Sequence, residues 1–148
     1  MVIYPDTSFL FSLYVAEEDS PRAHRYMQAV ATALAFTPFH RLELRTALRL
    51  RVFRNELSSS QLAVALGVSD EDLLTGILQH TPLVWADALR EAERLGEAYL
   101  TETGIRSGDL LHVASAVVLG AREFLTFDRR QAVLARRAGL KVKAWKLK

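Results

Sequence analysis

Residues 107–130 read SGDLLHVASAVVLGAREFLTFDRR and form the most informative stretch of the chain. The nearly all-apolar run 109–119 predicts a helix that is buried on most sides, and Gly120 is expected to end it. Residues 123–127 predict a short strand, and residues 129–138 predict another helix. A buried helix, a strand and a helix in direct succession are typical of an α/β fold.

The same alternation of short strands and helices extends over the rest of the chain. Strands are expected at 2–4, 34–37, 82–85, 123–127 and 140–144. Helices are expected at 9–16, 20–33, 40–55, 61–66, 70–79, 86–102, 109–119 and 129–138, with Gly67-Val68 separating 61–66 from 70–79. This order predicts a three-layer α/β/α sandwich with a short parallel sheet. We expect residues 1–148 to form one domain, with about 40–80 as a small helical lobe.

Composition excludes several classes of protein. Of the 148 residues, 50% are apolar and 24% are charged, which fits one soluble domain rather than a disordered chain. The absence of cysteine excludes disulfide scaffolds, zinc ribbons, thiol catalysis and iron–sulfur clusters, and favours a cytoplasmic protein. No apolar run approaches the about 20 residues that a membrane-spanning helix needs. No basic segment precedes the first strand, so a secretory signal is not expected.

The formal net charge of +2 conceals two basic regions and one acidic region. Residues 41–54 carry a net charge of +4 and residues 120–148 carry +7, whereas residues 66–119 carry −6. Such separation indicates a basic face for a polyanion or an acidic partner. Ordinary solvated helix faces explain the same pattern equally well.

Four carboxylates are predicted to approach one edge of the sheet. Asp6 follows the first strand and Asp128 follows the fourth, Asp109 opens the buried helix, and Glu43 lies near the start of the helix after the second strand. Taken singly, Asp6 and Asp128 could be helix N-caps, and Glu43 could pair with a neighbouring arginine. Asp109 is different, because a carboxylate beside so much apolar surface is costly unless it is paired or metal-bound.

Converging carboxylates have a specific chemistry. Like charges repel, so a dense carboxylate site binds protons or a hard cation, and carboxylate oxygens suit Mg²⁺ or Mn²⁺. One or two such ions can activate a water for attack on a phosphodiester, while basic flanks hold the nucleic-acid backbone.

The chain resembles the PIN-domain nucleases, in particular the VapC-like toxins of type II toxin–antitoxin systems. Four motifs in this order and spacing carry the resemblance over nearly the whole length: Asp6-Thr7-Ser8, Arg41-Leu42-Glu43-Leu44, residues 107–116, and Leu125-Thr126-Phe127-Asp128-Arg129-Arg130.

The resemblance implies a Mg²⁺- or Mn²⁺-dependent endoribonuclease. Its catalytic and metal-binding acidic quartet would be Asp6, Glu43, Asp109 and Asp128, with Asp6 and Asp109 as the central ligands. Small hydroxyl residues that line such sites would be Thr7, Ser8 and Thr126. The family resemblance also implies a cytoplasmic homodimer that is silenced by a cognate antitoxin protein.

Several basic residues are candidates for contact with RNA or antitoxin. Arg41, Arg45 and Arg49 recur at intervals of four, so they form one stripe on a helix, and a solvated face is the alternative interpretation. Further candidates are Arg106, Arg129 and Arg130. Lys141, Lys143, Lys146 and Lys148 alternate, which suits either a protected sheet edge or RNA binding. His112 is expected to be a packed, hydrogen-bonded histidine.

Three other functions remain open at this point. The chain could be a PIN nuclease of RNA processing that has no antitoxin. It could be a non-catalytic module that binds RNA or a protein partner without regard to divalent metal. It could also be a phosphatase with Asp6 as nucleophile, but that chemistry needs a second aspartate two residues later, where this chain has Ser8.

Overall fold

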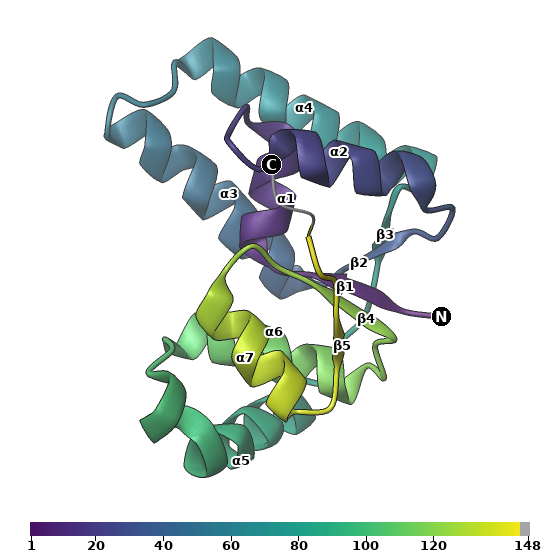
Figure 1. The fold of residues 1–148 in the computed structure, drawn as a ribbon. Coiled ribbons are helices and arrows are strands. Elements are labelled where there is room, and N and C mark those ends of the chain that lie inside the picture. Colours follow the sequence, from purple (N-terminus) through teal and green to yellow (C-terminus); the bar gives the residue numbers. More distant parts are fainter. Residues whose placement is uncertain (146–148) are drawn as a thin grey trace. The chain divides into compact units, whose positions relative to one another are not determined.

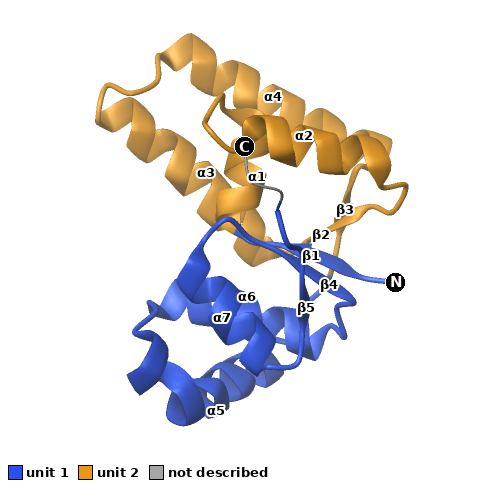
Figure 2. Cartoon of the chain, viewed as in Figure 1, with its two compact units in different colours: residues 1–6, 82–148 blue, residues 7–81 orange. Residues whose placement is uncertain are grey.

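The computed structural model describes residues 1–145, which form seven helices and five strands (Figure 1). These elements divide into two compact units (Figure 2). Unit 1 consists of residues 1–6 and the chain from Pro82 onward, and unit 2 consists of residues 7–81. Lys146 and Lys148, which belong to the predicted lysine alternation, lie outside the described residues.

Unit 1 joins the first strand to the last half of the chain. Its elements are β1 (Ile3–Pro5), α5 (Trp85–Thr103), α6 (Ser107–Val118), β4 (Glu123–Leu125), α7 (Arg129–Arg137) and β5 (Lys141–Val142). Strand β4 lies between β1 and β5 and pairs with both in parallel. The three helices pack on one another. The carboxyl ends of β1 and β4 therefore lie side by side.

Aromatic and aliphatic side chains fill unit 1. The rings of Tyr4 and Phe124, which are paired residues of β1 and β4, stack at a centroid distance of 5.7 Å. Helix α6 is buried over most of its surface, and Val113, Ala114 and Ala116 are completely inaccessible to solvent. The apolar run therefore forms the buried helix that the sequence predicts.

Unit 2 is mostly helical. Its elements are α1 (Thr7–Tyr14), α2 (Ser20–Ala29), β2 (Leu34–Phe36), α3 (Pro38–Phe53), α4 (Ser59–Thr75) and β3 (Leu78–His80). Strands β2 and β3 pair in parallel, with Leu34 opposite Leu78. Phe9 and Leu10 of α1 and Leu44 of α3 are buried.

One helix replaces the two that were predicted on either side of Gly67. Helix α4 runs without interruption from Ser59 to Thr75. A glycine inside a helix costs only about 1 kcal/mol relative to alanine, and Ser58 and Gln61 cap the start of α4 reciprocally. Gly76, with φ of 84°, ends the helix in the left-handed conformation.

The prediction of a strand at 82–85 is also wrong. Strand β3 lies earlier, at Leu78–His80, and the Thr81 amide donates to the Phe36 carbonyl at 3.0 Å just beyond it. Pro82 has no N–H and cannot continue such a ladder. Val84 instead becomes the N-cap residue of α5.

The predicted fold class is confirmed. The chain has an α/β, PIN-like fold, and every strand pairing in the described part of the chain is parallel. None of the helices within residues 1–145 has the length and apolar character needed to cross a membrane.

Candidate functional site

Asp6 and Thr126 meet at the carboxyl ends of the paired strands β1 and β4. The side chain of Asp6 is only 2% exposed, and its Oδ2 accepts a hydrogen bond of 2.6 Å from Thr126 Oγ1. The Asp6 amide donates to the Leu125 carbonyl at 2.9 Å. The parallel pairing of the two strands thus fixes both the main chain and the carboxylate of Asp6.

Asp128 joins the same network. Its amide donates to Thr126 Oγ1 at 2.9 Å, so the Thr126 hydroxyl accepts from Asp128 while it donates to Asp6. Asp128 is also the N-cap of α7, because its Oδ1 accepts from the Gln131 amide at 3.0 Å. Capping is therefore a real role of Asp128, and it holds the carboxylate at the start of the helix.

Asp109 is connected to Asp128 through Gln131. Gln131 is 1% exposed, and its side-chain Nε2 donates to the main-chain carbonyl of Asp109 at 3.1 Å. The first turn of α6 is thus tied to the first turn of α7. Sequence reasoning missed Gln131; the available signal was a polar residue three positions before the buried Leu134 of the same helix.

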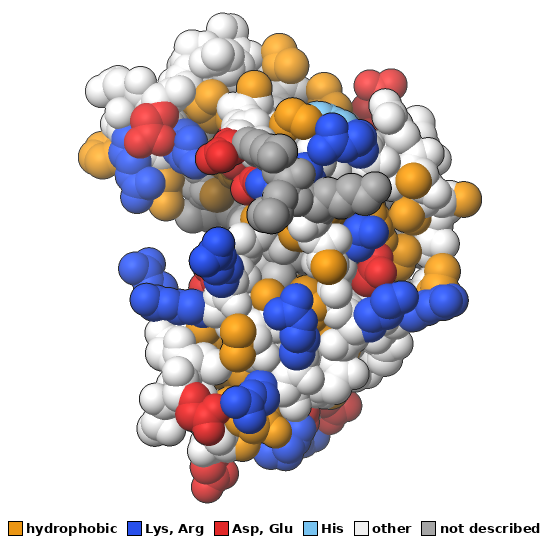
Figure 3. All heavy atoms as spheres, in the orientation of Figure 1, with side chains coloured by type: hydrophobic (Ala, Val, Ile, Leu, Met, Phe, Trp, Pro, Cys, Tyr) orange, Lys and Arg blue, Asp and Glu red, His pale blue; other side chains and the backbone are white. Residues whose placement is uncertain are grey.

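A surface hollow of about 500 Å³ opens beside these two helix starts. Its lining residues are Ile105, Arg106, Asp109, Asp128, Arg129 and Arg130. Three of the predicted basic contacts therefore share a hollow with two of the predicted acidic residues. Figure 3 shows Lys and Arg side chains spread over the visible face of unit 1.

Glu43 lies in unit 2, on α3. Its Oε1 accepts a 2.6 Å hydrogen bond from Thr7 Oγ1, and Thr7 directly follows Asp6 in the chain. Thr7 and Ser8 also line a hollow of about 290 Å³ within unit 2. Arg51 lines it as well, with its guanidinium over the Phe11 ring at 4.6 Å.

The arginine stripe of α3 faces another helix of unit 2. Arg45 lies 2.9 Å from Asp70 Oδ1 on α4, and Arg41 lies 3.9 Å from the same oxygen. Arg49, the third member, is exposed. Two of the three arginines thus pair with an aspartate of the same unit. This pairing favours the interpretation of the arginine stripe as an ordinary solvated helix face over a contact surface for RNA or antitoxin.

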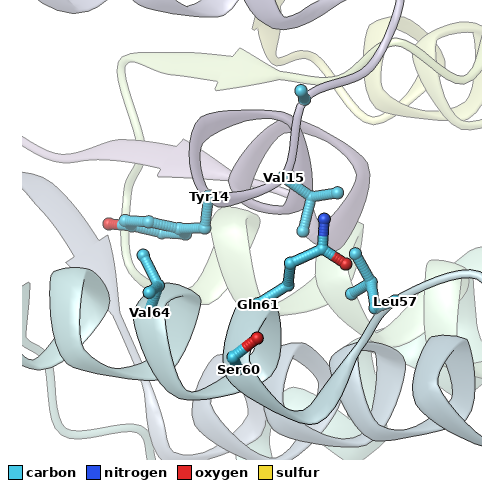
Figure 4. Close-up of a pocket in the computed structure, with 7 residues that line it drawn as sticks. Tyr14, Val15, Leu57, Ser60, Gln61 and Val64 are labelled. Atoms are coloured by element: carbon cyan, nitrogen blue, oxygen red, sulfur yellow. The ribbon is translucent and has the colours of Figure 1, made fainter.

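A third hollow, of about 270 Å³, lies where the end of α1 meets the start of α4 (Figure 4). Tyr14 and Val15 line it from one side, and Ser60, Gln61 and Val64 line it from the other. None of its lining side chains is charged. It therefore offers no carboxylate for a metal ion and no cationic group for a phosphate.

A divalent metal fits the chemistry of the hollow in unit 1. Within residues 1–145, no three His, Asp or Glu side chains are gathered closely enough to form a complete metal cage. Mg²⁺, however, is commonly held by only one or two carboxylates together with water and substrate oxygens. Asp109 and Asp128 on the shared hollow supply that kind of ligand, and Thr126 joins Asp6 to Asp128.

His112 has the structural role that was expected. It is fully buried on α6, and its Nδ1 lies 2.8 Å from the hydroxyl of Tyr4 on β1. The two rings also make an edge-on contact. This pair fastens α6 to the strand that carries Asp6.

Comparisons with known proteins agree with the fold. The model of the PIN domain matches residues 3–137. Among solved structures, VapBC2 from Rickettsia felis, bound to a DNA fragment from its promoter, is 18% identical at a TM-score of 0.66, covering 99% of this chain and all of the other. VapC20 from Mycobacterium tuberculosis, a sarcin–ricin loop cleaving toxin, is 17% identical at 0.63, covering 88% and 93% of the two chains.

A third similar structure is VapBC-5 from Mycobacterium tuberculosis, a member of the VapBC family of toxin–antitoxin systems. It is 22% identical at a TM-score of 0.59, covering 96% of this chain and 98% of the other. No curated protein matches the sequence. The domain match spans most of the chain, in both units, and the structural likeness extends over nearly its full length. The chain therefore belongs to the PIN domain family.

Proposed function

We propose that this protein is a metal-dependent endoribonuclease, a VapC-like toxin that hydrolyses RNA phosphodiester bonds. The observation that carries the proposal is the linked set of Asp6, Thr126, Asp128 and Asp109 beside a hollow rimmed by three arginines. Carboxylates that bind a hard cation and arginines that bind phosphates are the two requirements of such a reaction.

Asp109 and Asp128 are the proposed ligands of Mg²⁺ or Mn²⁺ on the hollow, and Asp6 is the third acidic residue of the site. When bound, the metal supplies activation of a water and neutralisation of the charge on the phosphate. The chain's own groups hold the ligands in place. The Thr126 hydroxyl has a single proton, which it gives to Asp6, and it fixes the Asp128 main chain with its lone pair.

Arg106, Arg129 and Arg130 are proposed to bind phosphates of the RNA on either side of the reacting one. All three are exposed side chains that line the same hollow as Asp109 and Asp128. Guanidinium groups bind phosphates through paired hydrogen bonds as well as charge. These residues would therefore set the position of the RNA backbone over the carboxylates.

Glu43 is proposed as the fourth acidic residue, with Thr7 and Ser8 as supporting hydroxyl residues. This assignment rests on the family motif and on the hydrogen bond from Thr7 to Glu43. The bond leaves Glu43 oriented by the residue that follows Asp6. The variant Glu43→Gln tests the assignment separately from the carboxylates of unit 1.

The protein is proposed to form a homodimer and to bind a cognate antitoxin. The support is that similar structures include VapBC2 and VapBC-5, the second described as part of a toxin–antitoxin system. An RNA substrate and such a partner would place the protein in the cytoplasm. A PIN nuclease of RNA processing would lack the antitoxin, so a small antitoxin gene next to this one distinguishes the two. That all 148 residues act as one domain, with 40–80 as a lobe, stays a prediction.

The decisive experiment is cleavage of an end-labelled mixture of structured RNAs by the purified protein with Mn²⁺, with Mg²⁺ and with EDTA. We expect metal-dependent cuts that leave 5′-phosphates, and loss of at least about a hundredfold in rate for Asp109→Asn. Asp87→Asn is the matched control, because Asp87 lies on the exposed surface of α5 and pairs only locally with Arg90. Full activity of Asp109→Asn, or equal cutting in EDTA, contradicts the proposal.

RNA binding that is indifferent to divalent metal, without cleavage of any RNA in the mixture, would instead favour a non-catalytic binding module. The same assay therefore separates the two candidate functions.

A further inference from the structure

We propose that Trp145, near the end of the chain, is a positioning residue for the carboxylate site of unit 1. Its indole Nε1 donates a 2.8 Å hydrogen bond to the main-chain carbonyl of Thr126. Its ring packs against Phe127 at a centroid distance of 4.7 Å and an interplanar angle of 37°. The contact is made to the very segment that carries Thr126 and Asp128.

The indole takes a place that a strand amide would otherwise hold. The Lys143 amide donates to the Phe124 carbonyl at 3.1 Å, next to the paired strands β4 and β5. In a regular parallel ladder, the amide two residues later would donate to the Thr126 carbonyl. The Trp145 side chain supplies that donor instead, so the ladder is continued by an indole.

Thr126 thereby has three short hydrogen bonds, and its hydroxyl also lies 3.4 Å from Gln131 Oε1. Its carbonyl accepts from Trp145, its hydroxyl donates to Asp6, and the same hydroxyl accepts from the Asp128 amide. A rotation of the Thr126 peptide would displace the hydroxyl from both aspartates. Trp145 opposes that rotation through the Thr126 carbonyl, whereas the hydroxyl of Thr126 holds Asp6 and Asp128.

Trp145 lies outside the residues that the PIN domain model matches, 3–137. The family model therefore assigns no role to the segment after β5. The inference rests on the proposed function for its consequence, which is metal binding, but the hydrogen bond itself acts on the fold whether or not the protein is a nuclease.

The test uses Trp145→Phe, which keeps an aromatic ring against Phe127 and removes the N–H donor. Trp85→Phe is the matched control, because Trp85 begins α5 in the same unit and is the other of the two tryptophans. Mn²⁺ binding to the full chain is measured by titration calorimetry. We expect Trp145→Phe to weaken it about tenfold, as is typical when a group behind a metal ligand is lost, and Trp85→Phe to leave it unchanged.

A second readout does not depend on metal. In ¹H–¹⁵N spectra, we expect Trp145→Phe to speed hydrogen exchange of the Asp128 amide and to shift the amide signals of residues 126–131. Trp85→Phe should leave these signals in place. Unchanged Mn²⁺ affinity together with unchanged Asp128 exchange would overturn the inference. If the unsubstituted protein bound no Mn²⁺ while Asp128 exchange still responded to Trp145→Phe, the proposed function would fail and the positioning role would stand.

A third measurement guards against misfolding of Trp145→Phe. In the Trp85→Phe protein, Trp145 is the sole tryptophan, and its fluorescence reports directly on this position. We expect Mn²⁺ to quench this emission, and the added substitution Asp128→Asn to abolish the quenching. Binding of Mn²⁺ without any change in Trp145 emission would count against the inference.

Discussion

Thr126 donates its hydroxyl proton to Asp6 over 2.6 Å, although 120 positions separate the two residues in sequence. The parallel pairing of β1 with β4 brings them together, because it places Pro5 opposite Leu125 and the residues that follow at the same edge. The hydrogen bond is buried, so it is poorly replaced by water once lost.

Removal of the Thr126 hydroxyl should therefore destabilise the protein. Thr126→Val keeps the shape of the side chain but removes this donor from the buried Asp6 carboxylate, and we expect a loss of about 1–3 kcal/mol in the free energy of unfolding. Urea denaturation measures this loss. Thr126→Ser is the control, since it retains the hydroxyl, and it should retain RNA cleavage that Thr126→Val loses. Equal stability and activity of the two variants would show that the hydroxyl is dispensable.

The arginines of the unit 1 hollow should act through charge. We expect each of three variants to weaken the binding of single-stranded RNA and to lower the salt dependence of that binding. These variants are Arg106→Gln, Arg129→Gln and Arg130→Gln. The slope of log affinity against log salt should fall by about 0.7 for each phosphate contact removed. Fluorescence anisotropy in the Asp109→Asn background measures binding without cleavage. Arg94→Gln on the outer surface of α5 is the control, and a slope change as large for Arg94→Gln would argue against a specific contact.

Tyr14 should make stability fall at alkaline pH. Burial raises the pKa of Tyr14 well above its usual range, and the hydrogen bond to Asp72 and the charge of Asp72 raise it further. Above about pH 10 the unfolded chain loses this proton while the folded chain keeps it. Stability contributed by Tyr14 is thus complete below pH 10 and declines above it, at up to about 1.4 kcal/mol per pH unit.

The comparison of unfolding midpoints between pH 8 and pH 11 isolates this effect. Tyr14→Phe has no hydroxyl to ionise, so its stability should fall less steeply than that of the unsubstituted protein above pH 10. Other tyrosines and lysines titrate alike in both proteins and cancel in the difference. Parallel pH profiles for the two proteins would contradict the assignment.

Gly67 offers a simple route to a more stable protein. It lies inside α4, and a Cβ added there would meet no atom within 4 Å. We expect Gly67→Ala to raise the free energy of unfolding by about 0.5–1 kcal/mol. Gly76→Ala is the opposite control, because φ of 84° at Gly76 is a conformation that alanine rarely adopts. Stabilisation by both substitutions would show that α4 does not end at Gly76.

The sequence was sufficient to predict the fold class and the positions of the aspartates. Alternation of strands and helices is local, and residues just after parallel strands must lie at one sheet edge, so Asp6 and Asp128 could be placed together in advance. The boundaries around Gly67 and Pro82 were predicted wrongly. Packing and capping of α4 outweighed one glycine, and pairing with β2 selected Leu78–His80 over the more apolar run that contains Pro82.

Interactions that join distant segments could not be predicted from the sequence. Gln131 and Trp145 have no motif of their own, and each gains its role only because another element is packed against it. The same holds for the pairing of Arg45 with Asp70, which required α3 and α4 to lie together. The catalytic roles of Asp6, Glu43, Asp109 and Asp128, in contrast, stay predictions until cleavage is measured.

Unit 1 is discontinuous in sequence, with β1 separated from its partner strand by the whole of unit 2. Asp6 emerges from the ribosome early in synthesis, but Thr126, Asp128 and Trp145 emerge only when the chain is nearly finished. The pairing of β1 with β4 therefore forms late, whereas residues 7–81 are available to fold earlier. A nascent chain thus has no assembled carboxylate network, and any chemistry that depends on this network can begin only when synthesis is almost complete.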